Sequence, residues 1–207
     1  MDSQEVKSII DHVWSFGFGG MEKDELEYLF SFCRDKKVLE LGCELGQSTY
    51  VISTVAEKVI CIDAWDDSYS HLNHDEIQKG IYLRDKEEHK SKILGGKTIF
   101  DRFKENCKVF IEEGKITFIK ALTKEVHGSF EDAFFDVILV DADHSFEGVY
   151  EDINNYLPKL KKDGLILFHD FNDEYWKGVT QATNKCTEEN KIQYVGEYKR
   201  IGVFKLK

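Results

Sequence analysis

Hydrophobic residues follow two different patterns along this chain. Near the N-terminus they recur every three or four positions, which predicts two amphipathic helices. After residue 37, short apolar runs alternate with further stretches of helical spacing. The apolar runs, predicted as strands, are Val38–Leu41, Val59–Ile62, Ile116–Ile119, Phe134–Val140, Leu165–Phe168, Ile192–Gly196 and Arg200–Leu206. This alternation predicts a doubly wound α/β fold, in which helices cover both faces of a mostly parallel sheet.

The helical stretches are placed by their apolar positions. One begins near Gln47, one extends from Phe146 to Leu160, and one covers Tyr175–Cys186. The faces of the two N-terminal helices carry Val6, Ile9, Ile10, Val13 and Trp14 in the first and Leu26, Leu29, Phe30 and Cys33 in the second.

Residues 64–98 do not fit this alternation. They are polar, contain scattered aromatic residues such as Trp65 and Tyr69, and end at Gly95 and Gly96. Segments of this length between strands are usually lids or binding loops. We therefore expect a single domain over residues 1–207 with a lid at 64–98, and a surface insertion without a role is the alternative.

The net charge and the positions of the cysteines indicate which classes of protein are excluded. The net charge of −11 argues against nucleic-acid binding, which needs clustered cations. No apolar run approaches the roughly 20 residues that span a bilayer, and the N-terminus lacks the pattern of a signal peptide. The cysteines form no C-x-x-C pair and mostly occupy apolar positions, so reduced core thiols in a cytoplasmic protein are expected. They are Cys33, Cys43, Cys61, Cys107 and Cys186.

Carboxylates and imidazoles follow two of the predicted strands. Asp141 and His144 come directly after Phe134–Val140, and His169 and Asp170 follow the next strand. In an open α/β sheet, ligands bind at the rim formed by the carboxyl ends of the strands. These side chains therefore predict an acid–base or metal site at one rim of the sheet.

A glycine-containing turn follows the first strand, in the pattern Glu40-x-Gly42-x-x-x-Gly46-x-Ser48. Glycine lets the backbone approach a ligand closely, and the helix after the turn offers its N-terminal amides. Asp63 ends the second strand about 20 residues later, where a carboxylate can bind a ribose diol. The pattern is not the G-x-G-x-x-G fingerprint, which argues against an NAD oxidoreductase.

Four segments together resemble the class I S-adenosylmethionine-dependent methyltransferases. They begin at Val38, Ile62, Val140 and Gly164 and read VLELGCELGQST, IDAW, VDADHSFE and GLILFHD. The nearest group is that of the small-molecule O-methyltransferases, which includes the macrocin and mycinamicin sugar methyltransferases. The resemblance covers residues 36–170 and implies a Rossmann-like sheet of seven strands, the last one antiparallel, preceded here by two N-terminal helices.

The resemblance also implies which residues hold S-adenosylmethionine. The turn would surround the methionine part, Asp63 would hold the ribose, and the stretch around Leu122 would contact adenine. The matching cofactor residues are Glu40, Gly42, Cys43, Gly46, Ser48, Asp63, Ala64, Leu122 and Asp141.

A metal site is implied in the same way. In the sugar methyltransferases, an aspartate after the fourth strand and an acidic pair after the fifth hold magnesium, and a nearby histidine is the base. The matching residues are Asp141, His169 and Asp170 for the metal, with His144 as the base and Asp141 beside it in catalysis. His169 replaces an acidic residue of the family, which opens manganese, iron or zinc besides magnesium. Asn172 or Asp173 could supply a further oxygen ligand.

Each of these residues also has a purely structural interpretation. Asp141 could cap the helix that begins near Ser145, and His144 could be an ordinary loop residue. His169 could orient Asp170 without binding anything. Trp65 could stack on a ligand or simply pack within the lid.

The sequence as a whole predicts methyl transfer from S-adenosylmethionine to a hydroxyl of a small molecule, for example a sugar, assisted by a divalent metal such as Mg²⁺ or Mn²⁺. A metal-independent methyltransferase for another acceptor, and a non-catalytic cofactor-binding protein of the same fold, are the alternatives. The expected partner is the small-molecule acceptor, with no nucleic acid or membrane. The oligomeric state is open, and a homo-oligomer is one of the possibilities.

Overall fold

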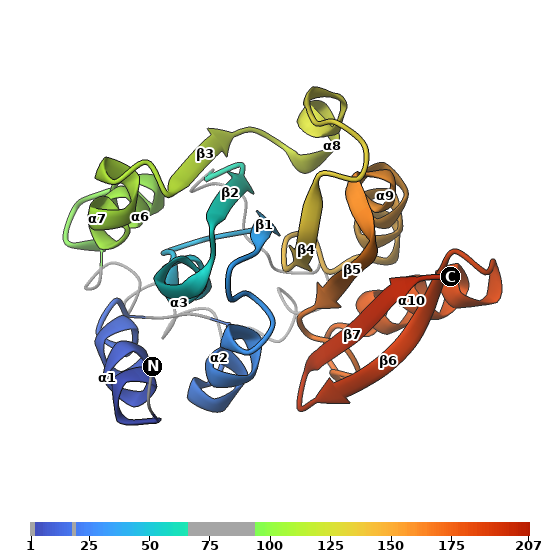
Figure 1. The fold of residues 1–207 in the computed structure, drawn as a ribbon, viewed down its shortest axis with the longest axis horizontal. Helices are drawn as coiled ribbons and strands as arrows, with labels where there is room; N and C mark the ends of the chain where they lie inside the picture. The colour runs from blue at the N-terminus through green and yellow to red at the C-terminus, as the bar shows by residue number, and fades with distance from the viewer. Residues whose placement is uncertain (1–2, 18–19, 66–93) are drawn as a thin grey trace.

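The computed structural model describes residues 3–17, 20–65 and 94–207, and Figure 1 shows their arrangement. Most of the predicted lid, including Tyr69, lies outside the described residues. Within them, seven strands form one sheet in the order β3-β2-β1-β4-β5-β7-β6. The strands are β1 (Lys37–Leu41), β2 (Lys58–Asp63), β3 (Ile116–Lys120), β4 (Phe135–Val140), β5 (Leu160–Phe168), β6 (Ile192–Tyr198) and β7 (Ile201–Leu206).

The directions of the strands confirm the predicted fold. β1 to β5 pair in parallel, whereas β7 runs antiparallel to both β5 and β6. Parallel pairing sends the carboxyl ends of β1, β2, β4 and β5 to one rim, which is where the predicted site residues lie. The doubly wound sheet with its last strand antiparallel is thus the fold that the resemblance implied.

Two hydrophobic cores, one on each face of the sheet, hold the helices in place. Successive residues of a strand point to opposite faces, so Val38 belongs to one core and Leu39 to the other, and both are fully buried. The first core packs α1 (Ser3–Trp14), α2 (Lys23–Phe30), α3 (Gln47–Val55) and α6 (Ile99–Asn106). The second packs α9 (Phe146–Tyr156) and α10 (Lys177–Glu188). The short helices are α7 (Lys108–Glu112), α8 (Thr123–Val126), η1 (His127–Ser129) and η2 (Leu157–Lys159).

Some predicted element ends are wrong. Leu160 was expected in a helix, but it begins β5 and pairs with Phe135. The α9 helix ends at Tyr156 because Pro158, which has no N–H to continue the α-helical pattern, lies in a 3₁₀ turn immediately after it. Helices α6 and α7 were not predicted, although Phe103 and Cys107 from this region are fully buried.

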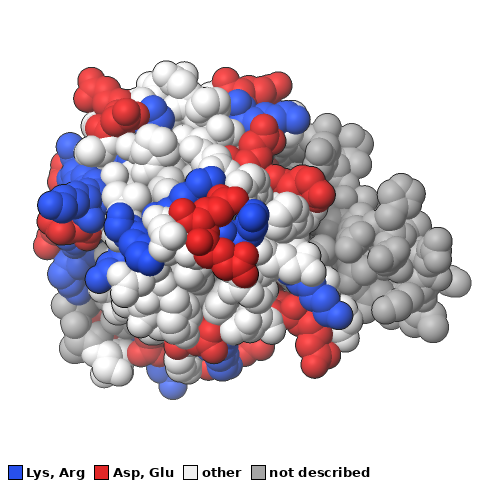
Figure 2. All heavy atoms as spheres, turned by 90° about the vertical axis from the view of Figure 1, so that its right-hand side faces the viewer, with Lys and Arg blue, Asp and Glu red and all other residues white. Residues whose placement is uncertain are grey.

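One face of the surface carries mixed charges, and the cysteines are buried free thiols as the sequence predicted. Figure 2 shows the side of the molecule that carries the β6–β7 hairpin, where Lys and Arg side chains are mixed with Asp and Glu rather than gathered in one patch. All five cysteines lie in the described residues, and each is buried as a free thiol. No helix in the described part of the chain is both long and apolar enough to cross a bilayer.

Candidate active site

The turn after β1 requires glycine at Gly42. Its φ of 83° is left-handed, and a Cβ added there would lie 2.0 Å from the backbone oxygen of Asp141. The Gly42 amide donates to Ile62 O at 2.9 Å, and the Asp141 amide donates to Leu41 O at 2.8 Å. Gly42 thus allows the ends of β1, β2 and β4 to meet at one point of the rim.

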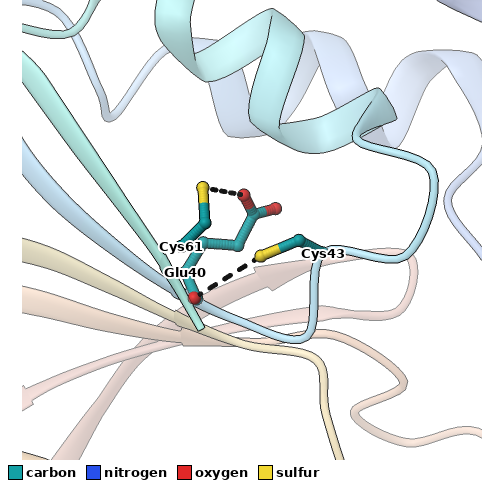
Figure 3. A group of neighbouring side chains, drawn as sticks. All are labelled: Glu40, Cys43 and Cys61. Carbon is teal, nitrogen blue, oxygen red and sulfur yellow. Dashed lines mark hydrogen bonds between the residues drawn. The ribbon is translucent and has the colours of Figure 1, made fainter. Parts of the chain in front are cut away.

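Glu40 and Ser48 lie beneath this turn and hold it together. Ser48 Oγ and Thr49 Oγ1 each donate to the Glu40 carboxylate at 2.5 Å, and Glu40 is fully buried. Figure 3 shows the Cys61 thiol 3.9 Å from the same carboxylate and the Cys43 thiol 3.7 Å from the Glu40 backbone oxygen. The sequence predicted that Glu40 and Ser48 contact the cofactor, whereas these side chains bond to one another and position the turn.

Burial makes Glu40 a source of pH-dependent stability. It raises the pKa of Glu40 to about 7, although the hydroxyls of Ser48 and Thr49 oppose the shift. Because the folded protein then binds this proton more tightly than the unfolded chain, the contribution of Glu40 is largest below pH 4.5 and declines as the pH rises to about 7. We expect Glu40→Gln to reduce the loss of unfolding free energy between pH 5 and pH 8 by about 2–3 kcal/mol.

Urea denaturation of both proteins at the two pH values measures this difference. The exposed Glu57→Gln is the matched control and should leave the pH dependence unchanged. An unaltered pH dependence in Glu40→Gln would mean that Glu40 is ionised in the folded protein.

Asp63 lies at the end of β2 and bonds to the turn. One carboxylate oxygen accepts from the amides of Cys43 and Glu44 at 2.7 and 2.9 Å, and the other accepts from the Trp65 amide at 2.6 Å. Each oxygen can accept more than one hydrogen bond, so the oxygen beside Trp65 retains capacity for a ribose hydroxyl. Asp63 is placed at the rim as predicted, and it also orders the turn.

The remaining predicted cofactor residues surround this region. Gly46 has a φ of 83° and packs so closely on α6 that a Cβ would lie 2.6 Å from Cys107 Sγ. Cys43 is almost fully buried, whereas Ala64 and Leu122 are half-buried beyond the ends of β2 and β3. Trp65 is buried against Phe100 and Phe103, with ring centroids 4.8 and 4.5 Å away. Its ring therefore packs in the core among the described residues.

Acidic and imidazole groups converge at the ends of β4 and β5. His144 Nε2 lies 2.9 Å from Asp170 Oδ2 and 3.5 Å from Asp141 Oδ1. His169 Nδ1 lies 3.1 Å from the same Asp141 oxygen and 3.3 Å from the same Asp170 oxygen. Trp176 stacks on the His144 ring at 4.5 Å between centroids. Two imidazoles thus flank one pair of carboxylate oxygens.

Two residues that the sequence did not point to complete this cluster. Glu25 of α2 is fully buried, and its Oε2 lies 3.5 Å from His169 Nε2. Arg200 precedes β7 and donates to Asp170 Oδ1 and to Glu25 Oε2, both at 2.8 Å. The signal that the sequence offered for Glu25 was an acidic residue in the first turn of a predicted helix, which is common in helices that carry no site residue.

The charges of the cluster shift the pKa values of its members. Burial lowers the pKa of His144, but hydrogen bonding to Asp141 and Asp170 outweighs this and raises the pKa to about 9. Burial also acts to lower the pKa of His169, but the negative charge of Asp141 outweighs burial, so the pKa is raised well above its usual value. Burial acts to raise the pKa of Asp170, but the contacts with His144 and His169 outweigh burial, so the pKa lies well below its usual value. The site therefore strongly attracts positive charge.

The sequence pattern of a family described as a methyltransferase domain matches residues 39–171, which span β1 to the end of β5 and include the rim. The chain belongs to this methyltransferase family. A curated relative, the uncharacterized protein R132 of Acanthamoeba polyphaga mimivirus, is 32% identical over 65 residues. That match spans 31% of this chain and 29% of the relative, so it covers less than a third of either protein.

Solved structures share the methyltransferase fold. The Podospora anserina methyltransferase PaMTH1 bound to SAH has a TM-score of 0.64 at 14% identity, over 97% of this chain and 88% of that one. A putative caffeoyl-CoA O-methyltransferase from Staphylococcus aureus has a TM-score of 0.64 at 15% identity, over 100% and 93%. Cofactor-bound Rv0187 from MTB has a TM-score of 0.65 at 10% identity, over 99% and 90%. At these identities the likeness concerns the fold.

The geometry of the site also bears on the structural interpretations of single residues. Ser145, not Asp141, caps α9, because Ser145 Oγ accepts from the Gly148 amide at 3.0 Å. Asn172 donates its side-chain amide to Glu197, and Asp173 accepts from the Tyr175 amide through Oδ1 while its Oδ2 lies 3.9 Å from Arg200 Nη1. The side chains that meet at the rim are Asp141, His144, His169 and Asp170.

Proposed function

We propose that this protein transfers the methyl group of S-adenosylmethionine to a hydroxyl of a small molecule, with a sugar as the first acceptor class to test. The observation that carries the proposal is the convergence of Asp141, His144 and Asp170 directly beside the Gly42 turn. Membership of the methyltransferase family supports the reaction type. We infer a hydroxyl acceptor because the site contains a base and acidic groups, which a better nucleophile than a hydroxyl would not need.

The residues at the turn fit the cofactor. Gly42 keeps side-chain atoms away from the point where the turn after β1 touches the backbone of Asp141 after β4, and Asp63 presents a carboxylate at the neighbouring strand end. A carboxylate at this place suits a ribose diol. S-adenosylmethionine supplies a methyl group on a sulfonium centre, which needs alignment and exclusion of water more than further activation.

His144 is the group that would remove the proton of the acceptor hydroxyl, through the ring nitrogen that does not face the carboxylates. Asp170 and Asp141 lie 2.9 and 3.5 Å from the other nitrogen, Nε2, and would stabilise the imidazolium that forms. The Trp176 ring packs against the imidazole at a tilt of 32°. Because the two carboxylates raise the pKa of His144 to about 9, the neutral base becomes abundant only as the pH rises toward that value.

The donor atoms at the rim also fit a divalent cation. Among the described residues, Asp141, His144 and Asp170 each offer a ligand atom, all within 4.8 Å of one another. With His144 kept as the base, the nitrogen ligand would be His169 Nδ1, which lies 3.1 Å from Asp141 Oδ1 and 3.3 Å from Asp170 Oδ2. Glu25, Asp141 and Asp170 carry three negative charges against one on Arg200, and either two protonated histidines or one divalent cation balances them. A bound cation would polarise the acceptor hydroxyl and compensate the carboxylates that keep His144 protonated. Imidazole beside two carboxylates favours Mn²⁺ over Mg²⁺.

Removing the cation should therefore reduce turnover. We expect EDTA to lower the rate of methyl transfer at least roughly tenfold, with Mn²⁺ restoring it at lower concentration than Mg²⁺, because a bound cation would polarise the hydroxyl and balance the carboxylates beside His144. The measurement follows S-adenosylhomocysteine formation before and after chelation. Full turnover in EDTA would favour the second candidate, a metal-independent methyltransferase in which the two histidines alone balance the carboxylates.

Binding of the product tests the cofactor proposal without knowledge of the acceptor. Calorimetry with S-adenosylhomocysteine should give one site per chain, and a screen of hydroxylated acceptors should then show methyl transfer. Neither heat nor a thermal shift would instead indicate a protein that kept the fold without the cofactor.

A further inference from the structure

Asp170 is held in an unusual backbone conformation at the centre of the site. Its φ of 57° is left-handed, which is uncommon for a residue with a side chain. The residue is 4% exposed, and its two carboxylate oxygens face different partners. Oδ2 lies 2.9 Å from His144, whereas Oδ1 accepts from Arg200 Nη1 at 2.8 Å. Something outside the strand must therefore hold the carboxylate in this orientation.

Arg200 is attached to Asp170 and to the N-terminal region at once. Its Nη2 donates to Glu25 Oε2 at 2.8 Å and to Gly20 O at 2.7 Å, and its Nε donates to Glu25 Oε1 at 3.2 Å. Its backbone oxygen accepts from the Phe171 amide at 2.9 Å. A planar guanidinium has a fixed fork of donors, so bonds to two carboxylates fix its position more firmly than a lysine could.

Glu25 anchors the other end of this arrangement. Besides Arg200, its carboxylate accepts from the Glu22 amide at 2.7 Å, as part of the capping box of α2. Being fully buried, it needs these donors, because an unpaired buried carboxylate is strongly destabilising. Helix α2 and the turn before β7 are thereby joined to the end of β5.

We propose that Arg200 is a positioning residue that occupies Oδ1 of Asp170, that Glu25 holds Arg200 in place, and that together they direct only Oδ2 toward His144 and the reacting groups. The inference rests on the proposed function for its effect on turnover, and on geometry alone for the orientation of Asp170. Both residues lie outside residues 39–171, the region that matches the family. This site is thus completed by two segments that the family pattern does not contain.

Lys199 provides a matched control. It is the neighbour of Arg200 in the same turn and contacts Glu22 and Asp24 at the start of α2 at 2.6 and 2.5 Å. Lys199→Met therefore weakens the attachment of the hairpin to α2 and leaves Asp170 untouched. Arg200→Met removes the bonds of Arg200 to Glu25 and Gly20 together with its bond to Asp170, while the Lys199 ion pairs to α2 remain. Arg200→Lys keeps the positive charge but lacks the planar set of donors.

The test compares kcat, KM and S-adenosylhomocysteine affinity, together with the imidazole ¹⁵N shifts of His144 and His169 at one fixed pH. We expect Arg200→Met to lower kcat roughly 10–100-fold with little change in cofactor affinity, and to move the His144 and His169 signals. Arg200→Lys should recover part of kcat, and Lys199→Met should leave all these quantities as in the wild type. If Arg200→Met does not fold, the double variant Glu25→Gln/Arg200→Met removes the buried unpaired charge and should show the same losses.

Two results would overturn the proposal. One is wild-type kcat and unmoved histidine signals in a folded Arg200 variant. The other is an equal loss in Lys199→Met, which would reduce the role of Arg200 to docking the hairpin. If the wild type methylates no acceptor, the proposed function fails, yet the histidine signals still decide whether Arg200 orients Asp170.

Discussion

Replacing His144 by alanine should lower kcat for methyl transfer roughly 10²–10⁴-fold, the range expected when a general base is removed. The imidazole lies 2.9 Å from Asp170 and 3.5 Å from Asp141, and among the described residues at this rim it is the least enclosed nitrogen base. His169 cannot replace it, because its side chain is fully enclosed between Asp141 and Glu25. The measurement is the steady-state rate with an acceptor found by screening.

His127→Ala is the control for this experiment. His127 lies in η1 against Tyr156, with 6.3 Å between the ring centroids, and does not reach the rim. It should retain full activity, and both variants should bind S-adenosylhomocysteine with wild-type affinity. Unchanged turnover in His144→Ala would remove the proposed base and leave proton removal to solvent or to another group.

Replacing Gly42 by alanine should destabilise the fold by about 2–5 kcal/mol and abolish tight cofactor binding. About 1–2 kcal/mol comes from a side chain at left-handed φ, and about 1–3 kcal/mol from overpacking. The added Cβ would lie 2.0 Å from Asp141 O, so the ends of β1 and β4 must separate. Urea denaturation and S-adenosylhomocysteine calorimetry measure the two effects.

Gly114→Ala separates the two causes. Gly114 has a φ of 70°, similar to that of Gly42, but nothing lies within 4 Å of its added Cβ. The control should therefore lose only about 1–2 kcal/mol and bind the cofactor normally. Equal losses at both positions would show that the close approach of the β1 and β4 ends tolerates a methyl group and does not explain the glycine.

The placement of the predicted site residues could be read from the chain because strand ends are local features. An apolar run that ends at Asp141 or at His169-Asp170 predicts both the strand and the residues at its carboxyl end. Parallel pairing then brings those ends to one rim, and the β1–β4 and β4–β5 registers confirm it. Gly42 was predictable for the same reason, since a tight turn after a strand is encoded within a few residues.

The direction in which a side chain points within that rim was less predictable. Glu40 belongs to the turn motif, yet its carboxylate bonds to Ser48 and Thr49 beneath the turn. Trp65 follows β2 as a possible ligand contact, yet its ring packs into the core. In both cases the sequence predicts where the residue lies along the chain. Whether its side chain points toward a ligand or into the interior depends on the residues that pack behind it.

The sequence by itself determined the class of fold, the strand ends that meet, and the residues Asp141, His144, His169 and Asp170 at them. Only the tertiary structure decided that Glu25 and Arg200, 175 positions apart, bind one another and hold Asp170. The physical reason is the distance along the sequence over which each interaction acts. Periodicity and turn chemistry act over a few residues, whereas a buried ion-pair network forms only after helix α2 and the last hairpin have packed against the sheet.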